Sequence, residues 1–149
     1  MQKTLERFKN WLVKLFFRIV RWLAYRRTLP AYRFRKAMEF FTSFIPVPSF
    51  ATYEPFGLSF MEAEWITPEN WDHESYILYL HGGGYGMGSI NTHRGLMARL
   101  GRAARARVLG INYRLAPEHP FPAAVEDAAT AYQYLLDMGI PPQRIAVAG

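Results

Sequence analysis

The chain has 149 residues, of which 50% are hydrophobic and 16% are aromatic, and it contains no cysteine. This length and composition allow one globular unit with a real core, and they exclude a disordered tail, a disulfide framework and thiolate metal sites. The net charge of +6 is uneven, because residues 1–36 carry eleven Lys and Arg against the single acid Glu6, whereas residues 37–149 carry seven against eleven acids. The basic character therefore belongs to the N-terminal segment.

Residues 3–27 have the pattern of a basic amphipathic helix, which we predict over about 5–27. Leucine, isoleucine and phenylalanine recur at steps of three and four residues, and lysine and arginine gather on the opposite side. Lys14, Arg18 and Arg21 interrupt the apolar run, which excludes a transmembrane span, and no small-residue cleavage site follows to indicate a signal peptide.

We expect this helix to pack on its own protein in the cytoplasm. Peripheral contact with an anionic membrane through residues 3–27 is the alternative, since such helices lie on lipid surfaces. No nucleic-acid module accompanies the charge, so we expect no nucleic-acid partner.

A proline-marked segment at 44–50 separates this helical part, residues 1–45, from shorter elements in residues 46–149. Two strands are predicted first, joined at Gly57, and then an apolar strand of the kind that is buried on both faces of a parallel sheet. The predicted elements are strands at 51–56, 58–66 and 75–80, a helix at 92–104, a strand at 107–113, a loop at 114–122, a helix at 122–139 and a strand at 144–149. This order predicts a doubly wound α/β sheet.

Several glycines directly follow the apolar strand at 75–80, in the stretch HGGGYGMG that begins at His81. Open α/β sheets place their ligands at the carboxyl ends of the strands, so a site is expected here. A nucleotide loop would need a lysine after the glycines or an acidic residue at the end of the next strand, and the sequence has neither. Acyl transfer fits better, because backbone N–H groups must stabilise the oxyanion of a tetrahedral intermediate, and glycine lets a substrate approach the backbone closely.

The His-Gly-Gly-Gly run resembles the oxyanion loop of lipases and esterases with the α/β-hydrolase fold. A second stretch, YRLAPEHPFPAAVEDA at 113–128, is similar to the corresponding segment of the hormone-sensitive-lipase family of esterases. The resemblance covers about residues 56–149. It implies that residues 1–45 form a helical cap segment and that residues 46–149 form the N-terminal half of an α/β-hydrolase catalytic domain.

The resemblance also implies roles for single residues. Gly83 and Gly84 would supply the N–H groups of the oxyanion hole, and His81 and Gly82 would support the loop; Tyr85 and Met87 would line the substrate pocket. Gly149 matches the first glycine of the family's nucleophile elbow, so the catalytic serine, acid and histidine are expected downstream of it. None of the four histidines present would then be the catalytic base.

The charged residues around the second stretch have a structural interpretation. Arg114, Glu118, Glu126 and Asp127 are expected to form a polar network near the loop at 114–122. Glu118 and Asp127 would sit in satisfied ion pairs and would not act as paired acid and base.

The predicted function is a serine carboxylesterase that hydrolyses short- to medium-chain acyl esters through an acyl-enzyme intermediate. No metal and no organic cofactor is implied. A non-catalytic small-molecule receptor, or an amidase or deacetylase, on the same fold is the alternative. Related esterases often form homodimers, so a homodimer is a further expectation.

Overall fold

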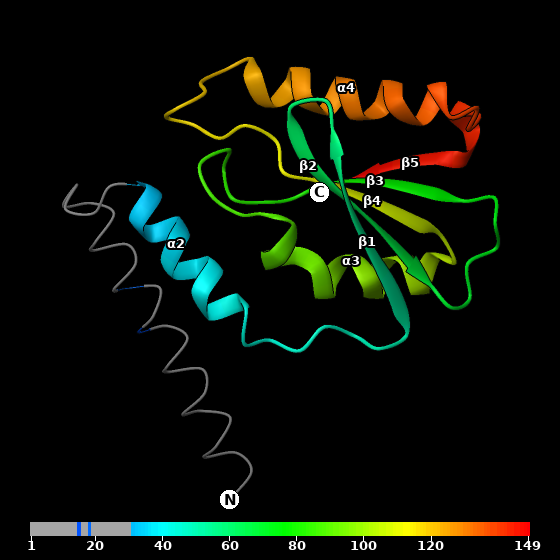
Figure 1. The fold of residues 1–149 in the computed structure, drawn as a ribbon, viewed down its shortest axis with the longest axis horizontal. Coiled ribbons are helices and arrows are strands. Elements are labelled where there is room, and N and C mark those ends of the chain that lie inside the picture. Colours follow the sequence, from blue (N-terminus) through cyan, green and yellow to red (C-terminus); the bar gives the residue numbers. More distant parts are fainter. Residues whose placement is uncertain (1–14, 16–17, 19–30) are drawn as a thin grey trace, which may run out of the picture. The chain divides into compact units, whose positions relative to one another are not determined.

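The computed structural model describes residues 31–149, together with Leu15 and Arg18 nearer the N-terminus (Figure 1). The chain divides into two units, residues 1–34 and 35–149, and the fold described below is that of the second unit together with residues 31–34 at the start of its first helix. Apart from Leu15 and Arg18, the helix predicted over 5–27 lies outside the described residues. Within the described part, no helix is both long enough and apolar enough to cross a membrane.

Three strands follow the first described helix, and helices and strands alternate from the third strand onward, as the sequence predicted for residues 51–149. The first described helix, at 31–42, was not predicted as a separate element. The elements in chain order are α2 (Ala31–Thr42), β1 (Ala51–Leu58), β2 (Met61–Pro68), β3 (Tyr76–Leu80), α3 (Ile90–Ala104), β4 (Arg107–Ile111), α4 (Ala123–Asp137), η1 (Pro142–Arg144) and β5 (Ile145–Ala148).

Helix α3 begins two residues earlier than the predicted start at Thr92. The reason is a capping box: the Ser89 hydroxyl oxygen accepts a hydrogen bond from the Thr92 N–H, and the Thr92 hydroxyl oxygen accepts one from the Ser89 N–H. These two bonds satisfy backbone donors that the first turn of a helix leaves unpaired.

The five strands form one mixed sheet in the order β1-β2-β4-β3-β5. Strand β3 pairs in parallel with β4 and β5, whereas β2 pairs antiparallel with β1 and β4. The predicted junction at Gly57 is wrong, because β1 continues through Gly57 to Leu58 and the hairpin turn consists of Ser59 and Phe60. Leu58 lies opposite Met61 in this register, so both side chains enter the core.

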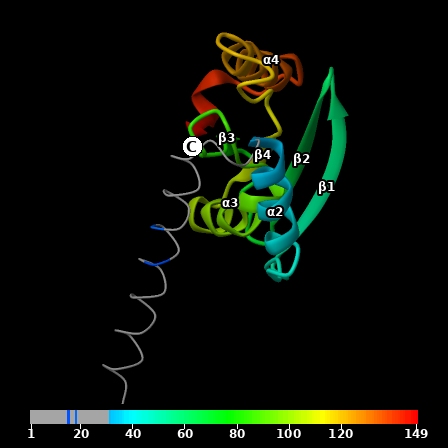
Figure 2. The same cartoon turned by 90° about the vertical axis from the view of Figure 1, so that its left-hand side faces the viewer.

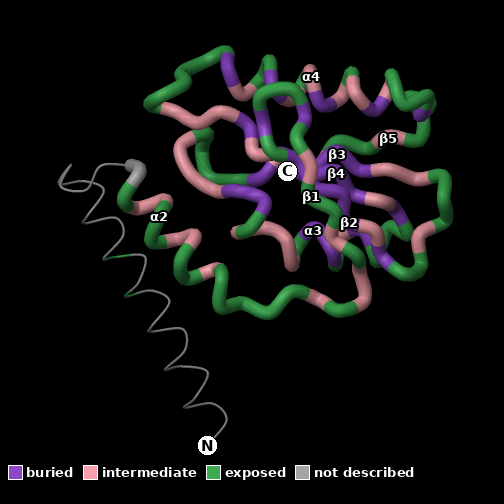
Figure 3. The backbone as a smooth tube through the Cα atoms, in the orientation of Figure 1, coloured by how far each residue is buried: buried purple, intermediate pink, exposed green. Residues whose placement is uncertain are grey.

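The two helices α3 and α4 cover opposite faces of the sheet (Figure 2). Successive side chains of β3 pack on opposite faces of the sheet. Ile77 packs in the cluster with Met97 of α3, and Leu78 packs in the cluster with Leu135 of α4. Buried residues follow β3 and β4 between the helices (Figure 3). Burial of one such side chain contributes about 1.5–3 kcal/mol, which explains why this strand is apolar almost throughout.

Candidate active site

The loop from Gly82 to Ser89, called the glycine loop below, leaves the carboxyl end of β3 and enters α3. Gly83 and Gly84 have positive φ angles, 132° and 61°. The N–H groups of Gly86 and Met87 both donate to the Gly83 carbonyl oxygen at 3.2 Å, and a Cβ on Gly83 would lie 2.1 Å from the Met87 carbonyl oxygen. The tight turn therefore needs glycine at position 83.

Several backbone donors of this loop are unused within the described part of the chain, namely the N–H groups of Gly82, Gly83, Gly84, Tyr85 and Gly88. Gly83 and Gly84 both line a cavity of about 510 Å³. Adjacent unpaired N–H groups beside a cavity can donate to an oxygen atom of a ligand.

The other walls of this cavity come from the same loop and from three further segments of the described chain. Tyr85 contributes from the glycine loop, Tyr113 from the segment after β4, Val125 from α4 and Val147 from β5. The predicted pocket residue Tyr85 thus lies at the cavity, whereas Met87 is not among its lining residues.

His81 is buried at the base of the glycine loop, with only 3% of its surface exposed. Its ring stacks on Tyr113 with a centroid distance of 4.2 Å, and the Tyr113 hydroxyl donates to the His81 carbonyl oxygen. The Nδ1 atom lies 3.1 Å from the Gly82 carbonyl oxygen; because a carbonyl oxygen only accepts, Nδ1 carries the proton in this hydrogen bond. Burial lowers the pKa of His81, which favours the neutral ring. His81 is thus placed where a supporting residue would be.

A buried carboxylate holds the segment after β4. Asp127 of α4 has no exposed surface. Its Oδ1 accepts from the Arg114 guanidinium at 2.7 and 2.9 Å, and its Oδ2 accepts from the Arg114 backbone N–H at 2.7 Å. Glu126 accepts from the same guanidinium at 3.0 Å. The predicted network is therefore confirmed for these three residues.

Glu118 does not belong to this network, so that part of the prediction is wrong. Its carboxylate does form the ion pair that was expected for it, but the partner is Arg35 of α2, at 2.9 Å. The sequence offered no sign of this pairing, because a separate helix brings the arginine to the loop.

Helix α2 also contacts the glycine loop, which sequence reasoning missed. The Arg35 Nε–H donates to the Gly86 carbonyl oxygen at 2.8 Å, and a second guanidinium N–H donates to the Ala116 carbonyl oxygen. Glu39 accepts hydrogen bonds from the Ser89 hydroxyl and, at 3.0 Å, from the Asn91 side-chain amide. The only sequence signal was an arginine and a glutamate four residues apart, which places them on one side of a helix.

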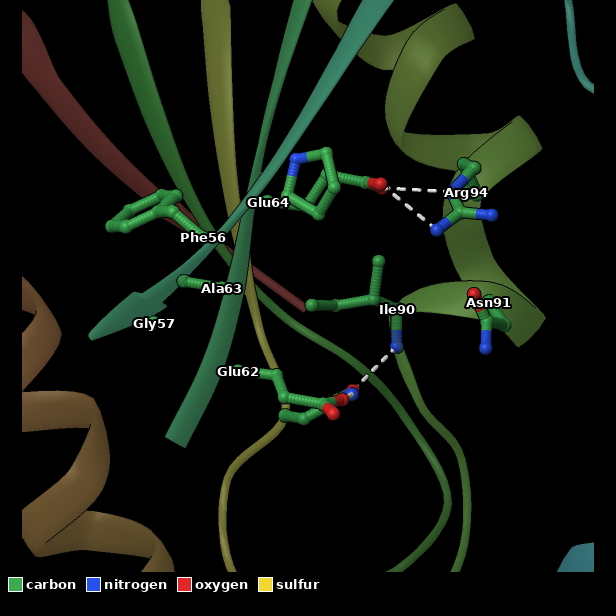
Figure 4. A pocket seen from close by; sticks show the side chains of 10 residues that line it. Phe56, Gly57, Glu62, Ala63, Glu64, Ile90, Asn91 and Arg94 are labelled. Carbon is green, nitrogen blue, oxygen red and sulfur yellow. Dashed lines mark hydrogen bonds and ion pairs between the residues drawn. The ribbon is translucent and has the colours of Figure 1, made fainter. Parts of the chain in front are cut away.

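A second cavity of about 380 Å³ lies between the β1–β2 hairpin and the start of α3 (Figure 4). Glu64 is 2% exposed, and its carboxylate pairs with the Arg94 guanidinium through two hydrogen bonds of 2.7 and 2.8 Å. Beside it, the Ile90 N–H donates to the Asn112 side-chain oxygen at 2.8 Å. These polar groups have partners inside the fold, so we assign them a structural role.

Metal binding has no candidate in the described residues. Within residues 31–149 there is no group of three or more His, Asp and Glu side chains that could hold a metal ion.

Comparisons with known proteins agree with the fold described above. Residues 77–149 match a family model described as alpha/beta hydrolase fold. Over 87 residues the chain is 54% identical to an acetyl-hydrolase of Streptomyces hygroscopicus, a match that covers 58% of this chain and 29% of the relative.

Two solved structures are similar over most of this chain. An esterase from the bacterial hormone-sensitive lipase family is 41% identical with a TM-score of 0.73, and the match covers 87% of this chain and 45% of that one. An esterase/lipase from an uncultured bacterium is 44% identical with a TM-score of 0.74, over 80% of this chain and 40% of that one. The described chain thus spans less than half the length of each of these relatives.

The fold that these matches define is the α/β-hydrolase fold. Within it, the chain resembles the esterases of the hormone-sensitive-lipase family, as the glycine run and the stretch at 113–128 predicted.

Proposed function

We propose that this protein is a carboxylic ester hydrolase that acts on short- to medium-chain acyl esters. The observation that carries the proposal is the adjacent N–H groups of Gly83 and Gly84, which donate to no residue that the structure describes and lie on the wall of a cavity of about 510 Å³. Its relatives support this choice, because those named above are an acetyl-hydrolase, an esterase and an esterase/lipase.

In the proposed reaction a serine hydroxyl attacks the ester carbonyl carbon, and the carbonyl π electrons move to the oxygen. Gly83 and Gly84 donate their N–H groups to this oxyanion, which lowers the barrier because the donors are already in place. Collapse of the intermediate breaks the bond to the alcohol and leaves an acyl-enzyme, which water then hydrolyses to the acid. The family resemblance assigns the serine, its acid and its histidine to sequence beyond Gly149.

The cavity walls suit an uncharged acyl group. Val125 and Val147 present aliphatic side chains, and Tyr113 presents an aromatic one. A small apolar pocket with a few polar donors at one side is the usual form of a site for an uncharged ligand. The proposal therefore assigns the acyl chain of the ester to this cavity.

The test uses the full-length protein that contains this chain. Intact mass is measured with and without a fluorophosphonate probe, and hydrolysis of p-nitrophenyl acetate and butyrate is compared with hydrolysis of p-nitroacetanilide. One probe adduct together with faster ester hydrolysis supports the proposal. An adduct with faster anilide hydrolysis favours the amidase alternative, and absence of both adduct and turnover favours the receptor alternative; either result overturns the proposal.

A further inference from the structure

Arg35 and Glu39 lie one helical turn apart on α2, and each contacts a different part of the glycine loop. Arg35 donates to the Gly86 carbonyl oxygen in the middle of the loop, and Glu39 accepts from the Ser89 hydroxyl at its end. We propose that these two side chains are positioning residues, which hold the glycine loop in the conformation that leaves the Gly83 and Gly84 N–H groups free for the oxyanion. This inference rests on the proposed function. It adds that ester hydrolysis requires the contacts of helix α2 with the glycine loop.

The loop needs support from outside because its own bonds are few. Gly82, Gly83, Gly84, Gly86 and Gly88 give the backbone more conformational freedom than any other residue would. Within the loop, the described backbone hydrogen bonds are the two that converge on the Gly83 carbonyl oxygen. Donors stabilise a developing charge only when their positions are fixed before the reaction, so a loop this free requires further contacts.

Arg35 supplies such contacts to two loops at once. Besides the Gly86 carbonyl, its guanidinium binds the Ala116 carbonyl oxygen and the Glu118 carboxylate of the segment after β4. The Ala116 N–H in turn donates to the Tyr85 carbonyl oxygen at 2.8 Å. The guanidinium side chain is only 20% exposed, and charge-assisted hydrogen bonds are stronger than neutral ones. Arg35 therefore joins the two loops into one unit.

Glu39 fixes the point where the loop becomes helix α3. Its carboxylate accepts from the Ser89 hydroxyl, whose oxygen also accepts from the Thr92 N–H at 3.2 Å in the capping box. It accepts a further hydrogen bond from Asn91. Because Ser89 is both the helix cap and the last residue of the loop, this contact sets the end of the loop as well as the start of the helix.

Kinetics of the full-length protein test the proposal, with Arg35→Ala, Arg35→Lys and the matched control Arg107→Ala. Arg107 has a similar side-chain exposure, 19%, and one carboxylate partner, Glu54 at 2.7 Å, but it lies at the other end of β4 from the loop. For Arg35→Ala we expect kcat with p-nitrophenyl butyrate to fall about 10- to 100-fold while KM changes less than about threefold. Arg35→Lys is expected to recover part of kcat, since an ammonium can still donate to one carbonyl oxygen.

The control separates positioning from loss of stability. Arg107→Ala is expected to lower the melting temperature as much as Arg35→Ala does but to leave kcat unchanged. Equal kcat values for Arg35→Ala and Arg107→Ala would overturn the proposal. A loss of kcat in both variants in proportion to their loss of melting temperature would overturn it as well. Glu39→Ala is expected to lower kcat in the same direction as Arg35→Ala.

Hydrogen exchange distinguishes failure of this inference from failure of the esterase proposal. Amide exchange of peptides covering residues 81–89 is expected to rise about tenfold in Arg35→Ala and to stay at the wild-type rate in Arg107→Ala. A wild-type protein without ester turnover but with this difference in exchange would reject the esterase proposal and keep the positioning role of Arg35. Unchanged exchange in Arg35→Ala would reject that positioning role whatever the activity.

Discussion

Replacement of Gly83 by alanine gives the sharpest test of the glycine loop. The new Cβ would lie 2.1 Å from the Met87 carbonyl oxygen, 2.6 Å from the Met87 carbonyl carbon and 2.9 Å from the Met87 Cγ. Real Cβ atoms essentially never approach other atoms to less than 3.0 Å, and two of these three atoms belong to the backbone. The loop must therefore open by about 1 Å, a displacement large enough to reduce catalysis about 100-fold when it affects reacting groups.

The expected loss follows from the role of the displaced N–H groups. Removal of one oxyanion donor reduces kcat by about 10² to 10³, which corresponds to about 2.7–4 kcal/mol of lost transition-state stabilisation. Because Gly83 carries one donor and precedes the other, we expect Gly83→Ala to reach at least the lower end of this range.

Two glycine variants serve as controls in the same p-nitrophenyl butyrate assay. Gly57→Ala meets nothing within 4 Å and is expected to keep wild-type kcat. Gly84→Ala also meets nothing within 4 Å, but its φ of 61° adds backbone strain of about 1–2 kcal/mol, so we expect a smaller kcat loss than for Gly83→Ala. A folded Gly83→Ala enzyme with kcat within about threefold of wild type would refute the assignment of the loop.

Three further predictions concern stability and surface binding. Asp127→Ala removes the buried partner of Arg114, whose side chain is 32% exposed and keeps Glu126 as a partner, so it is expected to lower the free energy of unfolding by about 1–3 kcal/mol in urea titrations; no measurable loss would contradict a stabilising role of this ion pair. Hydrogen bonds from the Ser75 hydroxyl and two backbone N–H groups lower the pKa of Asp72 to about 2, so its contribution to stability is present above pH 4 and lost as the pH falls towards 2. Asp72→Asn should therefore have a lower unfolding midpoint than wild type at pH 6, and the two midpoints should become equal near pH 2. The same difference at both pH values would contradict this account. If residues 3–27 contact anionic membranes, glutamate at their Lys and Arg positions should abolish pelleting with anionic vesicles, and unchanged pelleting would exclude that contact.

Local patterns were sufficient to predict the order of the elements from β1 onward and the position of the glycine loop, but not helix α2. The apolar run of β3 indicated burial on both faces, and the glycines after it could only follow its carboxyl end. Arg114 and Asp127 were also predicted to belong to one polar network, and they are only 13 residues apart, on the segment after β4 and in the second turn of α4. In each case the residues that interact, or the pattern that matters, lie close together in the sequence.

The sequence by itself thus determined the α/β class, the resemblance to esterases and the need for glycine at the end of β3. The tertiary structure decided which distant side chains support that loop: Arg35 reaches Ala116 across 81 residues, and Glu39 reaches Ser89 across 50. The tertiary structure also places the hairpin turn at Ser59 and Phe60 instead of the predicted junction at Gly57, because cross-strand pairing and core packing place Leu58 opposite Met61. The physical reason is that helix and strand periodicity reports short-range order, whereas a hydrogen bond between distant segments exists only after the sheet and its helices have packed.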